Sequence, residues 1–234
     1  MKAILVIGHS HMNALRAVPQ AQQACDFMPF TEAGGAYQSR DPAEFKAMAA
    51  GPADTLVFMM GGKTHIALGM LNPPEPFDFY LPEHTDLPMN PAARLLPVDL
   101  VRILLTRHLK QNLACLGQLS AVFKGRRQLH IESPPPLPSE YIERHPSGFA
   151  ERVRERGVAP VAFRHKFWLL HSAILRDHCA TLGITFVARP AGTQDADGCL
   201  AAPYQREDPT HANQAYGALL LDQILSLRQG APAL

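Results

Sequence analysis

Short runs of apolar residues recur along the chain, and stretches with helical spacing separate them. Residues 3–7 form a continuous apolar run, which is the pattern of a strand buried on both faces of a parallel sheet. Further short runs predict strands over residues 26–30, 55–60, 128–132 and 184–188. The hydrophobic pattern therefore predicts five strands.

The spacing of the remaining apolar residues predicts helices that alternate with these strands. One begins at about residue 11 and is disturbed at Pro19, and others cover residues 41–50, 97–124, 165–182 and 209–227. The helix from residue 97 has the longest apolar stripe, formed by Val98, Val101, Leu105, Leu109, Leu113, Leu116, Leu119 and Phe123. Gly125 and Gly183 stand where glycine typically ends a helix.

Alternation of strands and helices is typical of a parallel sheet that helices cover on both faces. We therefore predict a flavodoxin-like, three-layer α/β/α sandwich with a parallel sheet of about five strands, in one domain over residues 1–234. Proline-rich insertions at about residues 71–96 and 133–160 interrupt the alternation, and each follows the carboxyl end of a predicted strand. Ligands bind at that edge of open α/β sheets, so we expect both insertions to line the substrate pocket.

Composition narrows the class of protein further. The 234 residues are 47% hydrophobic and 18% charged, with a formal net charge of +1. This balance excludes a disordered or fibrous chain and gives no reason to expect nucleic acid or a membrane surface as a partner. Residues 163–168 interleave aromatic and basic side chains, which we interpret as the start of a helix that packs Phe167 and Leu170 inward.

The cysteines form no CxxC pair, so they predict neither a zinc site nor a redox motif. The chain shows no signal-peptide pattern and no apolar run of about 18 residues, the length of a membrane span. We therefore expect a soluble cytoplasmic protein with reduced thiols.

Three short segments at predicted strand ends or helix starts carry reactive groups: GHSH at residues 8–11, GGK at residues 61–63 and DPTH at residues 208–211. In the first, Ser10 either caps the following helix or presents its hydroxyl and backbone N–H to a ligand. In the last, Asp208 either caps a helix or bonds one ring nitrogen of His211 while the other reaches a nucleophile. The joint placement of the three segments in a parallel sheet favours the catalytic interpretation.

These motifs resemble those of the SGNH hydrolases, the GDSL-type esterase and lipase superfamily. Residues 8–10 match the family's Gly-x-Ser turn after the first strand, and residues 208–211 match its Asp-x-x-His before the last helix. Gly34 or Gly35 is the candidate for the family's second glycine. Two positions differ from the family pattern: His9 replaces an aspartate, and Lys63 stands where the oxyanion-hole asparagine is usual.

The resemblance implies serine-dependent hydrolysis of a small acyl ester, such as an acylated carbohydrate, or acyl transfer, with no cofactor. It implies Ser10 as nucleophile, His211 as general base and acid, and Asp208 as the group that fixes the imidazole tautomer. The backbone N–H groups of Ser10 and Gly35, together with Lys63, would form the oxyanion hole, with Lys63 shielded from solvent by residues 71–96. Substrate contacts are expected from Gly62, His65 and His11.

Two other interpretations remain open. In the first, His9 and His11 hold a divalent metal ion together with Asp208 and one further histidine, and the metal activates water. The candidates for that further ligand are His65, His84 and His130. In the second, the hydrolase fold has lost its oxyanion hole and only binds a ligand. The sequence leaves the ester, the acyl acceptor and the oligomeric state undetermined.

Overall fold

A computed structural model describes residues 2–29, 32–33, 36–37 and 50–230. Five parallel strands form the central sheet in the order β2-β1-β5-β8-β9. They are β1 (Ile4–Gly8), β2 (Cys25–Pro29), β5 (Thr55–Met59), β8 (Arg127–Ile131) and β9 (Thr185–Val187). Each lies within two residues of its predicted bounds, so the predicted parallel α/β fold is confirmed.

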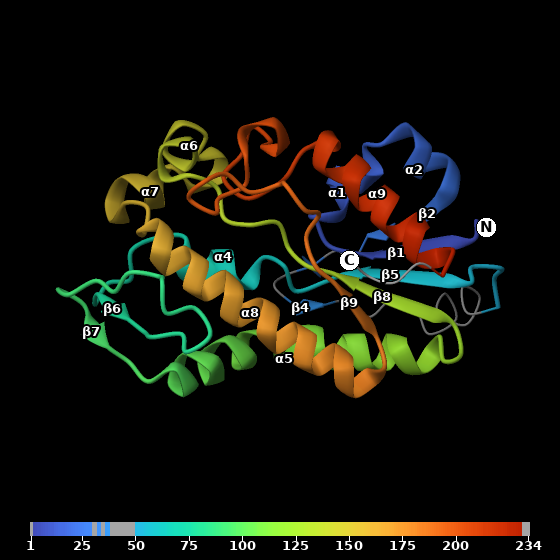
Figure 1. The fold of residues 1–234 in the computed structure, drawn as a ribbon, viewed down its shortest axis with the longest axis horizontal. Coiled ribbons are helices and arrows are strands. Elements are labelled where there is room, and N and C mark those ends of the chain that lie inside the picture. Colours follow the sequence, from blue (N-terminus) through green and yellow to red (C-terminus); the bar gives the residue numbers. More distant parts are fainter. Residues whose placement is uncertain (1, 30–31, 34–35, 38–49, 231–234) are drawn as a thin grey trace.

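Helices cover both faces of the sheet (Figure 1). On one face lie α1 (Met12–Arg16), α2 (Pro19–Ala24) and α9 (Gln214–Arg228), and on the other lie α5 (Val98–Val122) and α8 (Val161–Leu182). Alternate side chains of β1 pack in opposite directions, as a strand with helices on both sides requires: Ile4 and Val6 join the α1–α9 core, whereas Leu5 and Ile7 join the α5 core. Pro19 begins α2, which explains the predicted disturbance of the first helix.

The two long helices behave largely as their apolar patterns predict. In α5 the predicted stripe is buried or packed against the core. In α8 Phe167 and Leu170 face inward, and Gly183 ends the helix in the left-handed conformation with φ 70°. The first turns of α8 also bury the basic residues Arg164 and Lys166, so this end of the helix is enclosed on all sides.

Both insertions lie beyond the carboxyl ends of the sheet strands (Figure 1). After α4 (Thr64–Gly69), residues 71–96 pair β6 (Phe77–Asp78) with β7 (Arg94–Leu95), and residues 133–160 contain α6 (Ser139–Arg144), a 3-10 turn (Ser147–Phe149) and α7 (Ala150–Arg156). Shorter elements are β3 (Glu32–Ala33), β4 (Ala36–Tyr37) and a 3-10 turn (Ala202–Tyr204). The first insertion is tied to α8 by Lys166, whose Nζ donates to both carboxylate oxygens of Asp78 at 2.9 and 3.0 Å in a buried ion pair.

The predicted start of the last helix is wrong. The helix begins at Gln214, and the side chain of Asn213 caps it by accepting from the N–H groups of Ala215 and Tyr216. Asp208 and His211 therefore lie in an irregular loop before the helix, and the cap comes from Asn213 rather than from Asp208, the alternative role considered for that carboxylate. The helix predicted over residues 41–50 falls almost wholly outside the described residues. No helix in the described ranges has the length and apolarity needed to cross a bilayer.

Candidate active site

Ser10 lies in the turn that joins β1 to α1. Gly8 at the end of the strand permits this turn, because a Cβ atom there would be 2.5 Å from the carbonyl oxygen of Met59 on the neighbouring β5. The carbonyl oxygen of Ser10 accepts from the N–H of Asn13 at the start of α1, and its side chain makes no helix cap. The hydroxyl is instead exposed and lies 2.8 Å from Nε2 of His211. The serine therefore presents its Oγ to an imidazole and to solvent.

Asp208 orients His211 in the loop before α9. One carboxylate oxygen accepts from the backbone N–H groups of Thr210 and His211 at 2.9 and 2.8 Å, which folds the loop around the side chain. Both carboxylate oxygens lie 3.0 Å from Nδ1 of His211. This places the proton of the neutral ring on Nδ1 and leaves Nε2 to accept from Ser10.

The pKa of Asp208 is set by two opposing effects. Partial burial raises the pKa of the carboxyl group, and the hydrogen bonds from His211 and Thr210 lower it. The hydrogen bonds outweigh the burial, so the pKa lies well below its usual range. Asp208 is therefore ionised throughout the neutral pH range, as an orienting carboxylate must be.

The second glycine-rich turn, residues 61–63, lies beside Ser10 at the neighbouring strand end. The N–H of Gly61 donates to Nδ1 of His9 at 3.4 Å. Gly62 lies between two side chains: a Cβ atom there would be 2.6 Å from Oγ of Ser133 and 3.0 Å from the ring of His11. Among the described residues, the N–H groups of Ser10 and Gly62 donate to no protein acceptor. These two groups are available to a ligand.

Lys63 was expected to be shielded from solvent, and the structure shows it exposed. Its side chain is exposed at the first position before α4, and the insertion of residues 71–96 does not shield it. The reason is that this insertion packs Phe79 and Leu81 against α5 and α8 instead. Gly34 and Gly35, the candidates for the second family glycine, lie outside the described residues.

Buried imidazoles lie close to His211 and to one another. The rings of His11 and His211 have centroids 5.0 Å apart, and those of His65 and His171 are 4.9 Å apart. Burial, followed by the proximity of His211, lowers the pKa of His11 to about 3, and burial lowers the pKa of His171 to about 4. These rings are therefore neutral near pH 7. Sequence reasoning missed His171, because nothing in the apolar pattern of α8 marks it.

The metal interpretation finds no support in this arrangement. Nδ1 of His9 accepts a hydrogen bond from the backbone of Gly61, and His11 packs against the ring of His211. Over the part of the chain that the structure describes, no group of three or more His, Cys, Asp or Glu side chains is arranged to hold a metal ion.

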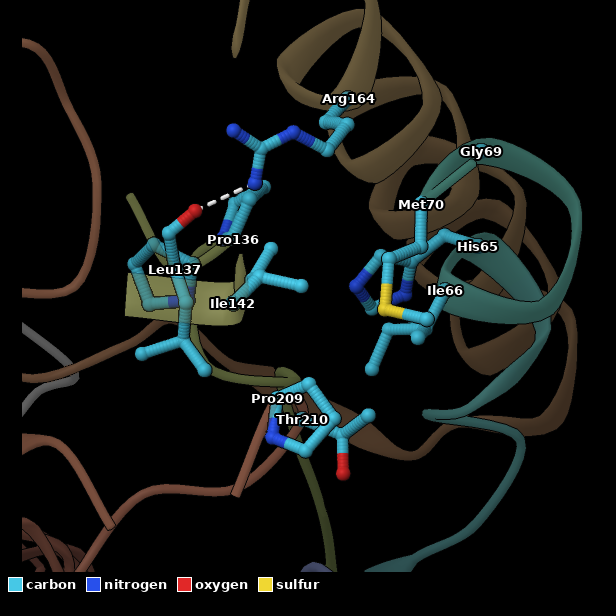
Figure 2. A pocket seen from close by; sticks show the side chains of 11 residues that line it. His65, Ile66, Gly69, Met70, Pro136, Leu137, Ile142, Arg164, Pro209 and Thr210 are labelled. Carbon is cyan, nitrogen blue, oxygen red and sulfur yellow. Dashed lines mark hydrogen bonds between the residues drawn. The ribbon is translucent and has the colours of Figure 1, made fainter. Parts of the chain in front are cut away.

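A pocket with about 340 Å³ of empty space, open solvent included, lies beside the loop of residues 208–211 (Figure 2). Pro209 and Thr210 from that loop form one end, and α4 and the second insertion form the walls. Residues 135–142 of the second insertion line this pocket, whereas the first insertion lines a separate cleft with residues 160–163.

Comparison with solved structures returns proteins of similar fold at low sequence identity. The periplasmic domain of the lipopolysaccharide acetyltransferase from Salmonella ser. Paratyphi A has a TM-score of 0.52 at 10% identity, over 98% of this chain and 84% of that one. A carbohydrate acetylesterase family member from Sinorhizobium meliloti has a TM-score of 0.47 at 14% identity, over 98% of both chains. A GDSL-like lipase from Bacteroides thetaiotaomicron has a TM-score of 0.43 at 10% identity, over 96% of this chain and 88% of that one.

No family model and no curated protein sequence matches this chain. At such identities the structural likeness shows the fold alone. That fold is of the SGNH-hydrolase type, as the motifs near residues 10 and 208–211 implied.

Proposed function

We propose that this protein is a serine-dependent ester hydrolase or acyl transferase. The observation that carries the proposal is the hydrogen-bonded series Ser10 Oγ, His211 Nε2, His211 Nδ1 and the Asp208 carboxylate, with contacts of 2.8 and 3.0 Å. A hydroxyl bonded to an imidazole that a carboxylate orients is the arrangement that activates serine as a nucleophile.

In the proposed reaction Ser10 Oγ attacks the ester carbonyl carbon and gives its proton to Nε2 of His211. The carbonyl oxygen becomes an oxyanion, which the free N–H groups of Ser10 and Gly62 are positioned to stabilise, with Gly35 and Lys63 as the further donors that the family resemblance implies. The tetrahedral intermediate collapses, the C–O bond to the alcohol breaks, and His211 returns the proton to the departing alkoxide. Water or a sugar hydroxyl, deprotonated by His211, then attacks the acyl-serine. The bond between the acyl carbon and Ser10 Oγ breaks, His211 returns the proton to Oγ, and the acyl group leaves as a carboxylic acid or as a new ester of the sugar.

The substrate in this proposal is a small acyl ester, such as an acylated carbohydrate. One observation agrees with an acyl substrate: the pocket beside the loop of residues 208–211 has largely apolar walls, which suit the hydrocarbon part of an acyl group. Similarity in fold to an acetyltransferase domain that acts on lipopolysaccharide agrees with acyl transfer to a sugar hydroxyl.

The experiment that tests the proposal is labelling of the purified protein with a fluorophosphonate probe, which reacts covalently with activated serines. We expect a single label on Ser10 that is lost in Ser10→Ala and His211→Ala. Ser226→Ala is the matched control, because Ser226 is an exposed serine on α9 away from the catalytic loop. Turnover that a chelator abolishes, without labelling, would favour the metal interpretation. Absence of both labelling and turnover would favour the ligand-binding interpretation.

A further inference from the structure

The pocket beside the catalytic loop has apolar walls and a polar far end. The apolar side chains that line it are Ile66, Met70, Pro135, Pro136, Leu137 and Ile142. Pro209 and Thr210 lie at one end, next to the catalytic residues, and the guanidinium of Arg164 lies at the opposite end (Figure 2). The pocket therefore runs along apolar walls from the loop that carries His211 to a cation.

Arg164 is an unusual residue to find at the end of such a pocket. Its side chain belongs to α8 and is only 3% exposed. Nε donates to the carbonyl oxygen of Ala159 at 2.9 Å, Nη1 to that of Leu137, and Nη2 to the hydroxyl of Ser139 at 2.7 Å. A guanidinium has five N–H bonds, so two of them have no acceptor among the described residues.

Arg164 forms no direct ion pair in the described part of the chain, although the nearby Cys199 and Glu143 favour its charged form. None of the carboxylates in the described ranges lies within 4.0 Å of its nitrogens. Burial lowers the pKa of Arg164 to about 10, which still leaves it charged at neutral pH. A buried charge without a partner is costly, and an anionic ligand group would offset that cost.

His65 provides a second polar group in the same pocket. It is 3% exposed, and in the described part of the chain neither ring nitrogen has a hydrogen-bond partner. Burial, followed by the proximity of His171 and His11, lowers the pKa of His65 well below its usual value, so the ring is neutral with one donor and one acceptor. Its ring lies on the α4 side of the pocket (Figure 2). A ligand or an ordered water can supply the partner that such a buried polar group lacks.

We propose that this pocket binds the acyl group of the substrate, and that this acyl group is short and ends in a carboxylate. The inference rests on the proposed function. The methylene groups contact the apolar walls, and the carboxylate accepts from the two free N–H bonds of Arg164 and from His65. Charge-assisted hydrogen bonds of this kind are stronger than neutral ones. An acyl chain that ends in a methyl group leaves these donors unpaired, and the site discriminates against it for that reason.

A pair of substrates with equal chain length tests the proposal. The mono-4-nitrophenyl ester of glutarate and 4-nitrophenyl pentanoate both have five-carbon acyl groups, and only the first ends in a carboxylate. We expect kcat/KM for the glutarate ester to exceed that for the pentanoate ester by at least tenfold. In Arg164→Gln this preference should fall below about twofold, whereas Arg144→Gln, which removes an exposed arginine of α6, should keep it. Equal kcat/KM for the two esters in the wild type would overturn the proposal.

Arg164→Gln can fail to fold, because the three hydrogen bonds of Arg164 tie α8 to neighbouring segments. A second variant covers this case. His65→Gln removes a side chain without a described protein partner, and we expect it to reduce the preference for the glutarate ester about three- to tenfold. An unchanged preference in this folded variant would remove His65 from the site.

Binding without turnover separates this inference from the proposed function. Calorimetry should detect binding of monomethyl glutarate to the Ser10→Ala variant. The double variants Ser10→Ala/Arg164→Gln and Ser10→Ala/His65→Gln should show no such binding. Turnover of the pentanoate ester with no glutarate preference and no such binding overturns the carboxylate site and leaves the serine esterase intact. Arginine- or His65-dependent binding without any ester turnover or Ser10 labelling supports the site and refutes the esterase.

Discussion

Gly217 on α9 lies directly against the backbone of Ala14 on α1. A Cβ atom at Gly217 would be 2.0 Å from the carbonyl oxygen of Ala14, so no other residue fits without moving one helix. Each helix follows one of the segments in the proposed active site: Ser10 precedes α1, and His211 precedes α9. Their close approach therefore sets the spacing between the proposed nucleophile and its proposed base.

The first prediction concerns this helix contact. Gly217→Ala should destabilise the protein by about 1–3 kcal/mol, as overpacking does, and should lower kcat by pushing His211 away from Ser10. Gly117→Ala is the matched control, because Gly117 lies within α5 with open space at its Cβ position. It should leave activity unchanged and stabilise the protein by about 0.5–1 kcal/mol. Urea unfolding and esterase assays on both variants measure these effects, and a Gly217→Ala protein with normal stability would contradict the prediction.

The second prediction concerns the carboxylate behind His211. Asp208→Asn keeps the shape of the side chain, but its amide can donate to Nδ1 and so favour the tautomer with the proton on Nε2. That tautomer cannot take the proton of Ser10, and we expect kcat to fall by about 100- to 10,000-fold. Asp54→Asn is the control: Asp54 pairs with Arg228 at the amino end of β5, far along the chain from the catalytic loop. Equal kcat in wild type and Asp208→Asn would exclude this carboxylate from the mechanism.

The third prediction concerns Lys63. If its ammonium group stabilises the oxyanion, Lys63→Ala should lower kcat by roughly 100-fold with little change in KM, because the contact strengthens in the transition state. Lys63→Asn restores the family pattern and should keep or raise the rate. Steady-state kinetics of both variants show whether the ammonium group of Lys63 stabilises the oxyanion. Unchanged kinetics in both would show that backbone N–H groups such as those of Ser10 and Gly62 suffice.

The fourth prediction is that the buried histidines make the fold sensitive to acid. Burial, followed by the proximity of His171, lowers the pKa of His130 to about 4. In the unfolded chain the histidine takes up a proton near pH 6.5, whereas in the folded protein it does so only near pH 4. The unfolded state therefore binds more protons in this window, and the free energy of unfolding falls as the pH falls from 6.5 to 4.

Replacement of that histidine should weaken the acid sensitivity. Between pH 6.5 and 4, His130→Leu should reduce the slope of unfolding free energy against pH by up to about 1.4 kcal/mol per pH unit. His108→Leu, which replaces an exposed histidine of α5, should leave the slope as in the wild type. Urea titrations at several pH values measure the slope, and equal slopes for wild type and His130→Leu would refute the assignment.

The strands, the long helices and the Ser10 and Asp208–His211 motifs could be predicted because each is encoded locally. A continuous apolar run specifies a buried strand wherever it occurs, and Gly183 ends its helix through its own backbone freedom. The start of the last helix could not be predicted, because Asp208-Pro209 and Asn213 both carry helix-start signals. In the structure the carboxylate of Asp208 shapes the loop that holds His211, and Asn213 caps the helix.

The buried cations were beyond sequence reasoning for a different reason. Arg164 and Lys166 are buried only because distant segments supply acceptors, Leu137 for the first and Asp78 for the second. Such partners depend on how the two insertions fold, which no local pattern encodes. The packing of the first insertion could not be predicted for the same reason. Its prolines indicate a stiff loop, but they do not specify the direction in which that loop packs.

The contact between Ser10 and His211 joins positions 201 residues apart. Long-range contacts of this kind close a large loop, and they form slowly because the chain entropy must be lost before the contact contributes. Helical content and the inner strands can be regained during refolding while the two catalytic segments are still separate. Under the proposed function, recovery of esterase activity reports on completion of the α1–α9 contact, a folding step that circular dichroism does not distinguish.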